Sequence, residues 1–213
     1  MSEDIVFYTS PMSRGRIVRW MLEEVGAPYH TELVDFAAPK PPGLLAVNPM
    51  GKVPALTHKG VAITETAAIC AYLADAFPAA GLAPAVGDPA RASYLRWLFF
   101  AAGPIETAVL VKALGVAVEG RQEVMAGFGS FERLLATLEQ ALGAADYLAG
   151  DRFSAADLYL GSELGWAIQF GSIPARPVFE AYVGRINARP AAVRARQIDD
   201  DLIARAQKEA GTA

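Results

Sequence analysis

The hydrophobic pattern of the chain changes its period once, and this change limits the folds that the chain can adopt. Residues 1–80 alternate short apolar runs with amphipathic stretches. After a segment rich in proline, glycine and alanine at 78–90, apolar residues recur at helical spacing only. The sequence therefore predicts an α/β domain at 1–80, a linker at 81–90 and an all-helical domain at 91–213.

The first domain is expected to contain both strands and helices. The apolar run at 5–8 predicts a strand, and the residues at 16–26 have helical spacing with a glycine as the stop. Alternation at 29–34 predicts a second strand. A proline-rich loop, two strands within 53–64 and a helix at 64–77 follow, which gives the order βαβ-ββα.

Composition excludes several classes of protein. Hydrophobic residues make up 53% of the chain and charged residues 20%, as in a globular protein with a real core. The formal charge is −4, and no basic stripe with interleaved aromatics is present, so nucleic acid is not expected as a partner. The single cysteine, Cys70, excludes an internal disulfide. His30 and His58 suggest no metal site.

The most apolar stretch, at 97–118, is interrupted by Gly103-Pro104, Glu106 and Lys112. These interruptions predict a buried, kinked helix rather than a membrane span. The acidic start of the chain does not resemble a signal peptide. The sequence therefore predicts a cytoplasmic protein with no membrane partner.

Polar chemistry is concentrated in "FYTSPMSRGR", where the first strand gives way to a helix. Tyr8, Ser10 and Ser13 supply hydroxyls there, and Arg14 adds a charge to the positive end of the helix dipole. Such a place lowers the pKa of a thiol. Because the turn contains no cysteine, a thiol stabilised here must belong to a ligand. The alternative is structural: Ser13 caps the helix, Ser10 starts a turn and Tyr8 is half-buried.

The segment "NPMGKVPAL" places a proline at the start of a strand. If the Val53-Pro54 bond is cis, the backbone of Val53 faces a cleft and can pair with an extended, peptide-like ligand. The alternative is an ordinary trans proline that opens the strand.

The segment "ITETAAI" places Glu65 and Thr66 at the beginning of a helix. Free N–H groups there favour a ligand carboxylate, and Glu65 can pair with an ammonium, so the two residues can hold an α-amino acid group. The alternative is a routine helix cap.

The segment "DRFSAADLYLG" carries a folding signal. Ser154 and Asp157 have the spacing of a capping box, with Asp in place of the usual Glu. We expect the Asp157 side chain to be buried and hydrogen-bonded.

Taken in order, "YTSPMSRGRIVRWMLEEVG", "NPMGKVPAL", "TETAAICAYLAD" and "FSAADLYLG" resemble the soluble glutathione S-transferase family over nearly the whole chain. The resemblance implies a thioredoxin-like N-terminal domain (βαβ-α-ββα) and an all-α C-terminal domain. It also implies a homodimer with one glutathione site per subunit, and no metal.

By this resemblance, Val53 and a cis-Pro54 pair with the cysteinyl backbone of glutathione. Glu65 and Thr66 hold its γ-glutamyl end, where the family more often has Glu or Gln followed by Ser.

The same resemblance assigns the glycine carboxylate of glutathione to Lys52 and Lys40. Both lysines can equally be solvated loop charges.

The hydroxyl that activates the thiol is left open among three residues. Ser13 matches the serine-type pattern, Tyr8 with Arg14 matches the tyrosine-type pattern, and Ser10 before a proline resembles the tau-type start. We favour Ser13, because it lies nearest the helix N-terminus.

For the electrophile, the resemblance implies an apolar wall in the helical domain, formed by Trp97, Phe100, Pro104 and Trp166. Aromatic residues at helical spacing are otherwise typical of a core. Glu106 is a candidate to reach the ligand of a partner subunit.

Two classes of function follow. The first is a detoxifying transferase that ionises glutathione and adds it to an apolar electrophile, with isomerase, lyase and peroxidase variants. The second is a binding or regulatory protein that keeps the scaffold without catalysis. The complete set of candidate ligand contacts favours the enzyme.

Overall fold

The structure is a computed structural model that describes residues 4–211. The chain forms two compact units. The first contains the residues up to Ala80 together with those from Ala188 onward, and the second contains Gly81–Asn187.

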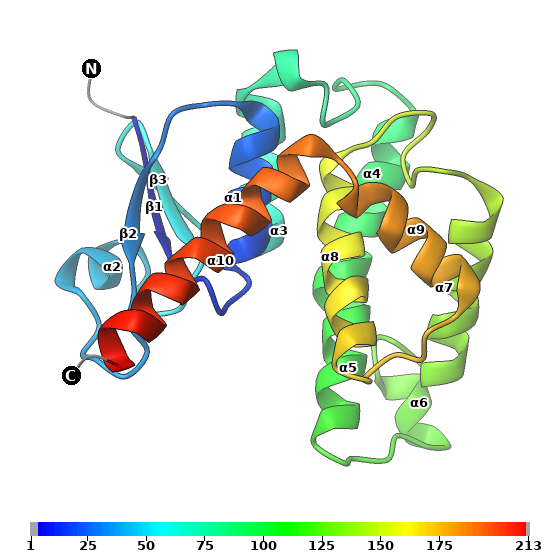
Figure 1. Ribbon diagram of the computed structural model, residues 1–213. Coiled ribbons are helices and arrows are strands. Elements are labelled where there is room, and N and C mark those ends of the chain that lie inside the picture. Colours follow the sequence, from blue (N-terminus) through cyan, green and yellow to red (C-terminus); the bar gives the residue numbers. More distant parts are fainter. Residues whose placement is uncertain (1–3, 212–213) are drawn as a thin grey trace. The chain divides into compact units, whose positions relative to one another are not determined.

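The first unit is built on a four-stranded sheet with the strand order β2-β1-β3-β4 (Figure 1). Strand β1 runs parallel to β2 and antiparallel to β3, and β3 is antiparallel to β4. The elements in chain order are β1 (Ile5–Thr9), α1 (Gly15–Val25), β2 (His30–Leu33), α2 (Pro42–Val47), β3 (Ala55–His58), β4 (Val61–Thr64), α3 (Thr66–Ala76) and η1 (Pro78–Ala80). This order confirms the predicted thioredoxin-like α/β fold.

One short helix was not visible in the hydrophobic pattern. The proline-rich segment reads as a loop, yet α2 begins at Pro42. Proline is tolerated in the first turn of a helix, where its missing N–H would have no intrahelical partner. A proline-rich sequence therefore does not exclude a helix that starts within it.

The two faces of β1 pack against different helices. Ile5, Phe7 and Thr9 are fully buried, and the Phe7 ring lies 5.3 Å from the guanidinium carbon of Arg19 on α1. Tyr8 points to the other face, where it packs on a buried cluster of Val34, Leu44 and Ala55 that includes α2. Alternation along β1 thus directs Phe7 and Tyr8 to opposite faces.

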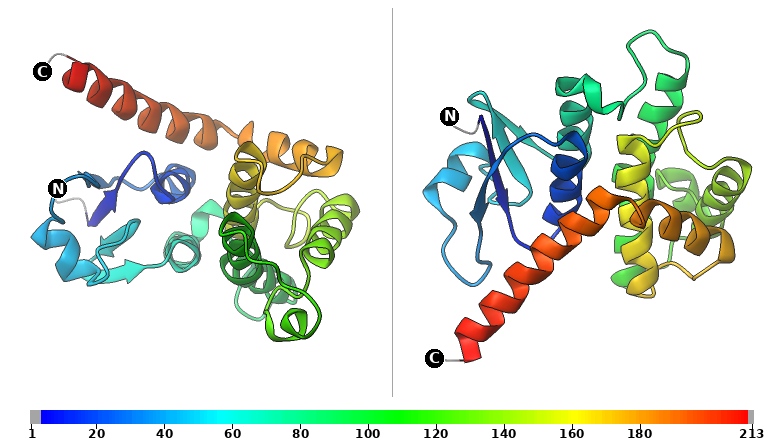
Figure 2. Two further views of the ribbon diagram at one scale, coloured as in Figure 1. Left: turned by 90° about the horizontal axis from the view of Figure 1, so that it is seen from below. Right: turned by 45° about the horizontal axis from the view of Figure 1, so that its top comes forward.

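The last helix, α10 (Pro190–Gly211), belongs to the first unit and packs along α1 (Figures 1 and 2). The sequence predicted an all-helical domain at 91–213, which included this helix, and the structure corrects that assignment. Two features of α10 account for this packing: Ala191, Ala192 and Ala195 are buried, and its charges complement those of the antiparallel α1. The ion pairs are Arg16–Asp200, Arg19–Asp199, Glu23–Arg194 and Glu24–Arg189.

The pair between Arg19 and Asp199 is buried. Each residue is 1% exposed, and Arg19 Nε donates to Asp199 Oδ1 over 2.7 Å. Burial raises the pKa of the Asp199 carboxyl, and the nearby Arg19 charge opposes that rise. Arg19 also donates to the hydroxyls of Tyr29 and Thr31. Burial raises the pKa of Tyr29 to about 12, so this phenol is a neutral member of the network.

The second unit contains helices only, as predicted from the pattern. They are α4 (Ala90–Phe100), η2 (Ala101–Ile105), α5 (Glu106–Ala113), α6 (Arg121–Met125), α7 (Phe131–Ala144), α8 (Ala155–Gln169) and α9 (Pro177–Asn187). The elements α4, η2 and α5 form one helical stretch, in which η2 is a π-helix containing Pro104. Because a proline has no N–H to donate, Pro104 removes one hydrogen bond from the helical ladder, and the π-helix forms a single-turn bulge within the longer helical stretch.

This stretch, Ala90–Ala113, is long and apolar enough for a membrane span by length and composition, with a mean hydropathy of 1.2. Core helices of soluble domains can be equally long and apolar. The sequence predicted a buried helix. That prediction is only partly right, since 33% of the most apolar part of this stretch is buried. The α4 part packs on α8, and its Tyr94, Trp97 and Leu98 are buried, whereas Phe99 and Leu110 are exposed.

The predicted capping box is present at the start of α8. Asp157 is fully buried, and its carboxylate accepts hydrogen bonds from Leu148 N, Ser154 N, Ser154 Oγ and the Tyr182 hydroxyl. Burial raises the pKa of Asp157, and the donated hydrogen bonds oppose the rise. The residue therefore ties the start of α8 to α9 in the core of the second unit.

The buried pair on α10 yields a stability prediction. Asp199→Asn leaves the Arg19 charge buried without its counter-ion, and we expect a loss of roughly 3–5 kcal/mol in the free energy of unfolding. The measurement is denaturant unfolding followed by circular dichroism.

The neighbouring Asp200 is the matched control, because its pair with Arg16 is partly exposed, with 52% of the Asp200 side chain and 25% of the Arg16 side chain accessible to solvent. Asp200→Asn should cost no more than about 1 kcal/mol. The double variant Arg19→Met, Asp199→Leu removes both charges and should recover most of the loss. Equal losses for Asp199→Asn and Asp200→Asn would contradict this account.

Candidate functional site

The turn between β1 and α1 is closed by the hydroxyl of Ser13. Ser13 Oγ donates to the carbonyl oxygen of Ser10 over 2.7 Å and accepts from the N–H of Gly15 over 3.0 Å. Arg14 occupies the position just before α1 and is exposed. The hydroxyl therefore sits at the first turn of α1, where free N–H groups give a partial positive charge.

The same turn has no room for a side chain at Gly15. A Cβ at this position would overlap the hydroxyl oxygen of Thr9 and would lie 3.0 Å from Ser13 Oγ. Thr9 is fully buried at the end of β1, so it has no space in which to move away. Glycine at this point lets α1 begin directly against the end of the strand.

Arg16 holds the turn from its other side. Its guanidinium donates to the Pro11 carbonyl over 3.4 Å and to Asp200 Oδ1 on α10 over 2.6 Å. The loop that carries Ser10 and Ser13 is therefore connected to α10 as well as to α1.

The structure separates the three candidate hydroxyls into two groups. Ser10 and Ser13 lie together in the turn, with Ser10 mostly buried. Tyr8 lies on the opposite face of the sheet, and its hydroxyl approaches Gly43 of α2 so closely that a Cβ there would be 3.0 Å away. Sequence alternation had left the direction of Tyr8 open.

The peptide bond between Val53 and Pro54 is cis. It lies directly before β3, with Pro54 buried and Val53 half-buried. The loop before it is braced by Asn48, whose side chain donates to the Lys52 carbonyl and accepts from Met50 N. Sequence reasoning gave Asn48 no role, although an Asn-Pro pair is a turn signal.

Lys40 and Lys52 belong to the same corner of the first unit. The Lys40 stem packs against Gly51, with its Cγ 3.3 Å from the place of a Cβ there, and its ammonium lies 5.0 Å from the centre of the Phe36 ring. Lys52 is exposed beside Gly51. The structure therefore places the two predicted cations, Lys40 and Lys52, near each other.

Glu65 has a backbone conformation that is rare for a residue with a side chain. Its φ is +65° and its ψ is +119°, and it stands between the end of β4 and the start of α3. Such a conformation costs roughly 1–3 kcal/mol and persists at ligand sites where the surrounding structure enforces it. Thr66, the first residue of α3, is 8% exposed.

Sheet register brings these separate segments to one edge. Ala55 pairs with Tyr8 on one side and with Thr64 on the other. Pro54 therefore lies beside the end of β1 and beside Glu65, which follows β4. The β1–α1 turn, the cis bond and the strained glutamate converge although they are far apart in the sequence.

The residues predicted to bind the electrophile lie in the second unit and differ in exposure. Trp97 is 3% exposed and packs edge-to-face on Phe100, so its ring is a core element. Phe100, Pro104 and Trp166 are partly exposed and retain surface that a ligand can contact.

The protein's own thiol is not available for the same chemistry. Cys70 on α3 is fully buried, and burial raises the pKa of its thiol. Within residues 4–211, no cluster of three or more His, Cys, Asp or Glu side chains is suited to hold a metal ion.

Two family models match the chain, one in each half. Residues 9–76 match the glutathione S-transferase N-terminal domain, and residues 90–190 match the C-terminal domain of the same family. The chain belongs to the glutathione S-transferase family. This confirms the predicted family, the thioredoxin-like plus all-α fold and the predicted activity as a glutathione S-transferase.

Individual relatives support the assignment. A glutathione S-transferase GST-4.5 of Xanthomonas campestris is 32% identical over 162 residues, which are 73% of this chain and 76% of that protein. Glutathione S-transferase 3 of Zea mays is 31% identical over 206 residues, covering 86% and 89%. A sphingomonad glutathione S-transferase solved with glutathione is 36% identical, with a TM-score of 0.76 and coverage of 92% and 98%.

The close packing at Gly15 yields a prediction for this site. Gly15→Ala forces Thr9 and Ser13 apart, so we expect a loss of roughly 1–3 kcal/mol in unfolding free energy. Because the turn itself is displaced, glutathione affinity measured by calorimetry should fall as well.

Gly184→Ala is the matched control, because a Cβ at Gly184 in α9 meets no neighbour within 4 Å. This variant should be neutral or slightly stabilising, by up to about 1 kcal/mol, with unchanged glutathione affinity. A Gly15→Ala protein that binds glutathione like the parent would refute the role assigned to the turn.

Proposed function

We propose that the first unit binds glutathione at the sheet edge where the β1–α1 turn, the Val53–Pro54 bond and Glu65 converge. The observation that carries this proposal is the register of β3, which pairs Ala55 with both β1 and β4. The sphingomonad relative, which has the same fold, was solved with glutathione.

In this proposal each part of glutathione has its own contacts. The backbone of Val53 pairs with the cysteinyl residue, while Glu65 and Thr66 hold the charged γ-glutamyl end beside the start of α3. Lys52 and Lys40 attract the glycine carboxylate. The positive φ of Glu65 supports this role, because residues held in such strained conformations cluster at ligand sites.

The thiol is ionised by the β1–α1 turn. Burial of the thiol opposes ionisation, so the turn must supply a larger opposite effect. Lowering a thiol pKa from about 8.5 to about 6.5 requires roughly 3 kcal/mol. One hydrogen bond to a charged group, worth about 1.5–3 kcal/mol, together with about 1 kcal/mol from the helix dipole, meets that requirement.

Ser13 is our choice of donor, with Ser10 and Tyr8 as the alternatives. The Ser13 hydroxyl turns its proton from the Ser10 carbonyl to the thiolate, while its oxygen continues to accept from Gly15 N–H. Arg14 adds a positive charge at the same turn. The orientation of Tyr8 toward Gly43 supports the choice of Ser13, because it directs the phenol to the α2 side of the sheet.

The thiolate then attacks an apolar electrophile, forming a carbon–sulfur bond as the leaving group departs or the double bond takes up a proton. We assign recognition of the electrophile to the second unit, through Phe100, Pro104 and Trp166. We further propose a cytoplasmic homodimer that acts in detoxification. The exposed Phe99 and Leu110 support a partner on the helical stretch Ala90–Ala113.

The test is a pH titration of the ultraviolet absorbance of thiolate, with glutathione added to the protein. The parent should give a bound-thiol pKa of about 6.5. Ser13→Ala should raise that pKa by about one to two, the equivalent of one charged hydrogen bond, because the donor is lost. Ser10→Ala and Tyr8→Phe should leave it near the parent value.

Ser162→Ala controls for the loss of a serine hydroxyl, because Ser162 lies on α8 and donates only to the Leu158 carbonyl in its own helix. A rise seen only in Ser10→Ala or only in Tyr8→Phe transfers the donor role to that residue. Binding of glutathione with no lowered pKa would refute ionisation by this turn.

A further inference from the structure

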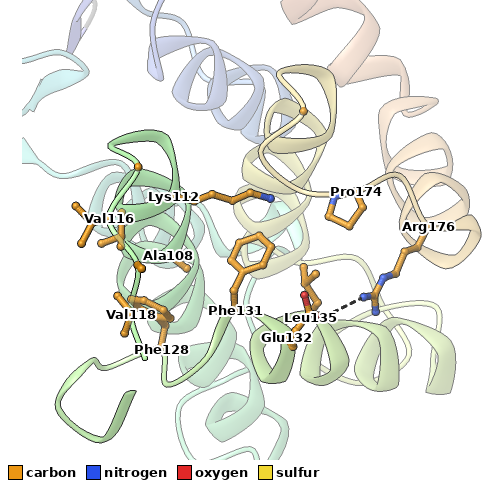
Figure 3. Close-up of a pocket in the computed structure, with 14 residues that line it drawn as sticks. Ala108, Lys112, Val116, Val118, Phe128, Phe131, Glu132, Leu135, Pro174 and Arg176 are labelled. Carbon is orange, nitrogen blue, oxygen red and sulfur yellow. Dashed lines mark ion pairs between the residues drawn. The ribbon is translucent and has the colours of Figure 1, made fainter. Parts of the chain in front are cut away.

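The second unit contains a pocket of about 590 Å³ that the proposed reaction does not use. Figure 3 shows it between α5, the segment that follows α5, the start of α7 and the loop that precedes α9. All of its lining residues fall between 108 and 176. The volume is in the range of small-molecule sites in proteins.

The body of the pocket is apolar. Phe128 and Phe131 form an aromatic wall, and Val116, Leu135 and Pro174 complete the apolar lining. Gly115, whose φ is +68°, lies just after the end of α5, where the chain turns around the pocket. A flat hydrocarbon group is the kind of ligand that such a lining binds.

The two basic side chains at the pocket, Arg176 and Lys112, differ in their ion pairing. Arg176 is paired with Glu139 at 2.6 Å and with Glu132 at 3.8 Å, the latter pair being marked in Figure 3. Lys112 has a different environment. Its ammonium donates to the Ser172 carbonyl over 2.9 Å and lies 4.3 Å from the centre of the Phe131 ring.

No carboxylate within the described part of the chain forms an ion pair with Lys112. An ammonium group carries three donors, and the Ser172 carbonyl accepts one of them. A full positive charge with donors to spare therefore stands at the edge of an aromatic pocket. The complementary ligand has a ring system for the wall and one anionic group for the ammonium.

We propose that this pocket is a second binding site, which takes an aromatic carboxylate whose ring contacts Phe131 and Phe128 and whose carboxylate pairs with Lys112. All of the pocket's lining residues belong to the second unit, whereas the glutathione contacts proposed above belong to the first. The proposal does not depend on which hydroxyl ionises glutathione, nor on the identity of the electrophile.

The test compares two ligands of the same shape, 1-naphthoate and its neutral amide, 1-naphthamide, by isothermal titration calorimetry with the full chain. Lys112→Met removes the charge and keeps an unbranched side chain. The affinity for 1-naphthoate should fall about tenfold or more, as expected for one charged hydrogen bond. The affinity for 1-naphthamide should change by less than about threefold.

Arg133→Met is the matched control, because it removes one exposed positive charge from α7 outside the pocket. It should bind both ligands like the parent. Lys112→Arg keeps the charge and should retain most of the affinity for 1-naphthoate.

A second variant tests the location without touching the charge. Val116 is 54% exposed, so Val116→Trp can fill the pocket with little effect on folding. It should abolish binding of both ligands.

Unchanged affinity for 1-naphthoate in Lys112→Met, or binding of both ligands to Val116→Trp as to the parent, would overturn the proposal. So would displacement of 1-naphthoate by saturating S-hexylglutathione in the parent, because that result would place the naphthoate at the glutathione contacts. Loss of glutathione ionisation with naphthoate binding intact would count against the proposed mechanism and leave the second site standing.

Discussion

The packing of α10 along α1, which includes the buried pair of Arg19 and Asp199, is the interaction on which the arrangement of the first unit depends. The pair joins α1 to α10, whose residues are separated by most of the chain. Neither charge is exposed, so each is acceptable in the core only while the other is present. The partly exposed pair between Arg16 and Asp200 lies one turn nearer the start of α1 and extends the same contact toward the β1–α1 turn. Helix α1, which supplies the dipole, therefore has the sheet on one side and α10 on the other.

That constraint explains why the turn can be so compact. With α1 held by the sheet on one side and by α10 on the other, the chain passes from Thr9 to α1 through Gly15 without space for a side chain. The Ser13 hydroxyl then closes the turn by hydrogen bonding to backbone on both sides. The oxygen of the hydroxyl is fixed by the Gly15 N–H, so in the proposed mechanism only its proton has to turn from the Ser10 carbonyl to the thiolate.

Much of the fold follows from local pattern, because strands and amphipathic helices have their own periods. The β1 strand, the helix that ends at Gly26 and the capping box of Ser154 and Asp157 were all readable in this way. The β1–α1 turn and Glu65 were recognisable as candidates for the same reason, since helix starts have characteristic residues. The support given by Asn48 to the loop before Pro54 was not readable, because a side-chain contact with the backbone has no periodicity.

The sequence by itself determined the two kinds of domain and the family, and it supplied the candidate residues for glutathione chemistry. Tertiary structure alone decided that α10 packs on α1, that Tyr8 faces Gly43, and that Lys112 stands at an aromatic pocket. The physical reason is the range of the interactions. Helix and strand periods arise between residues a few positions apart, whereas ion pairs and packing join residues that only the folded chain brings together.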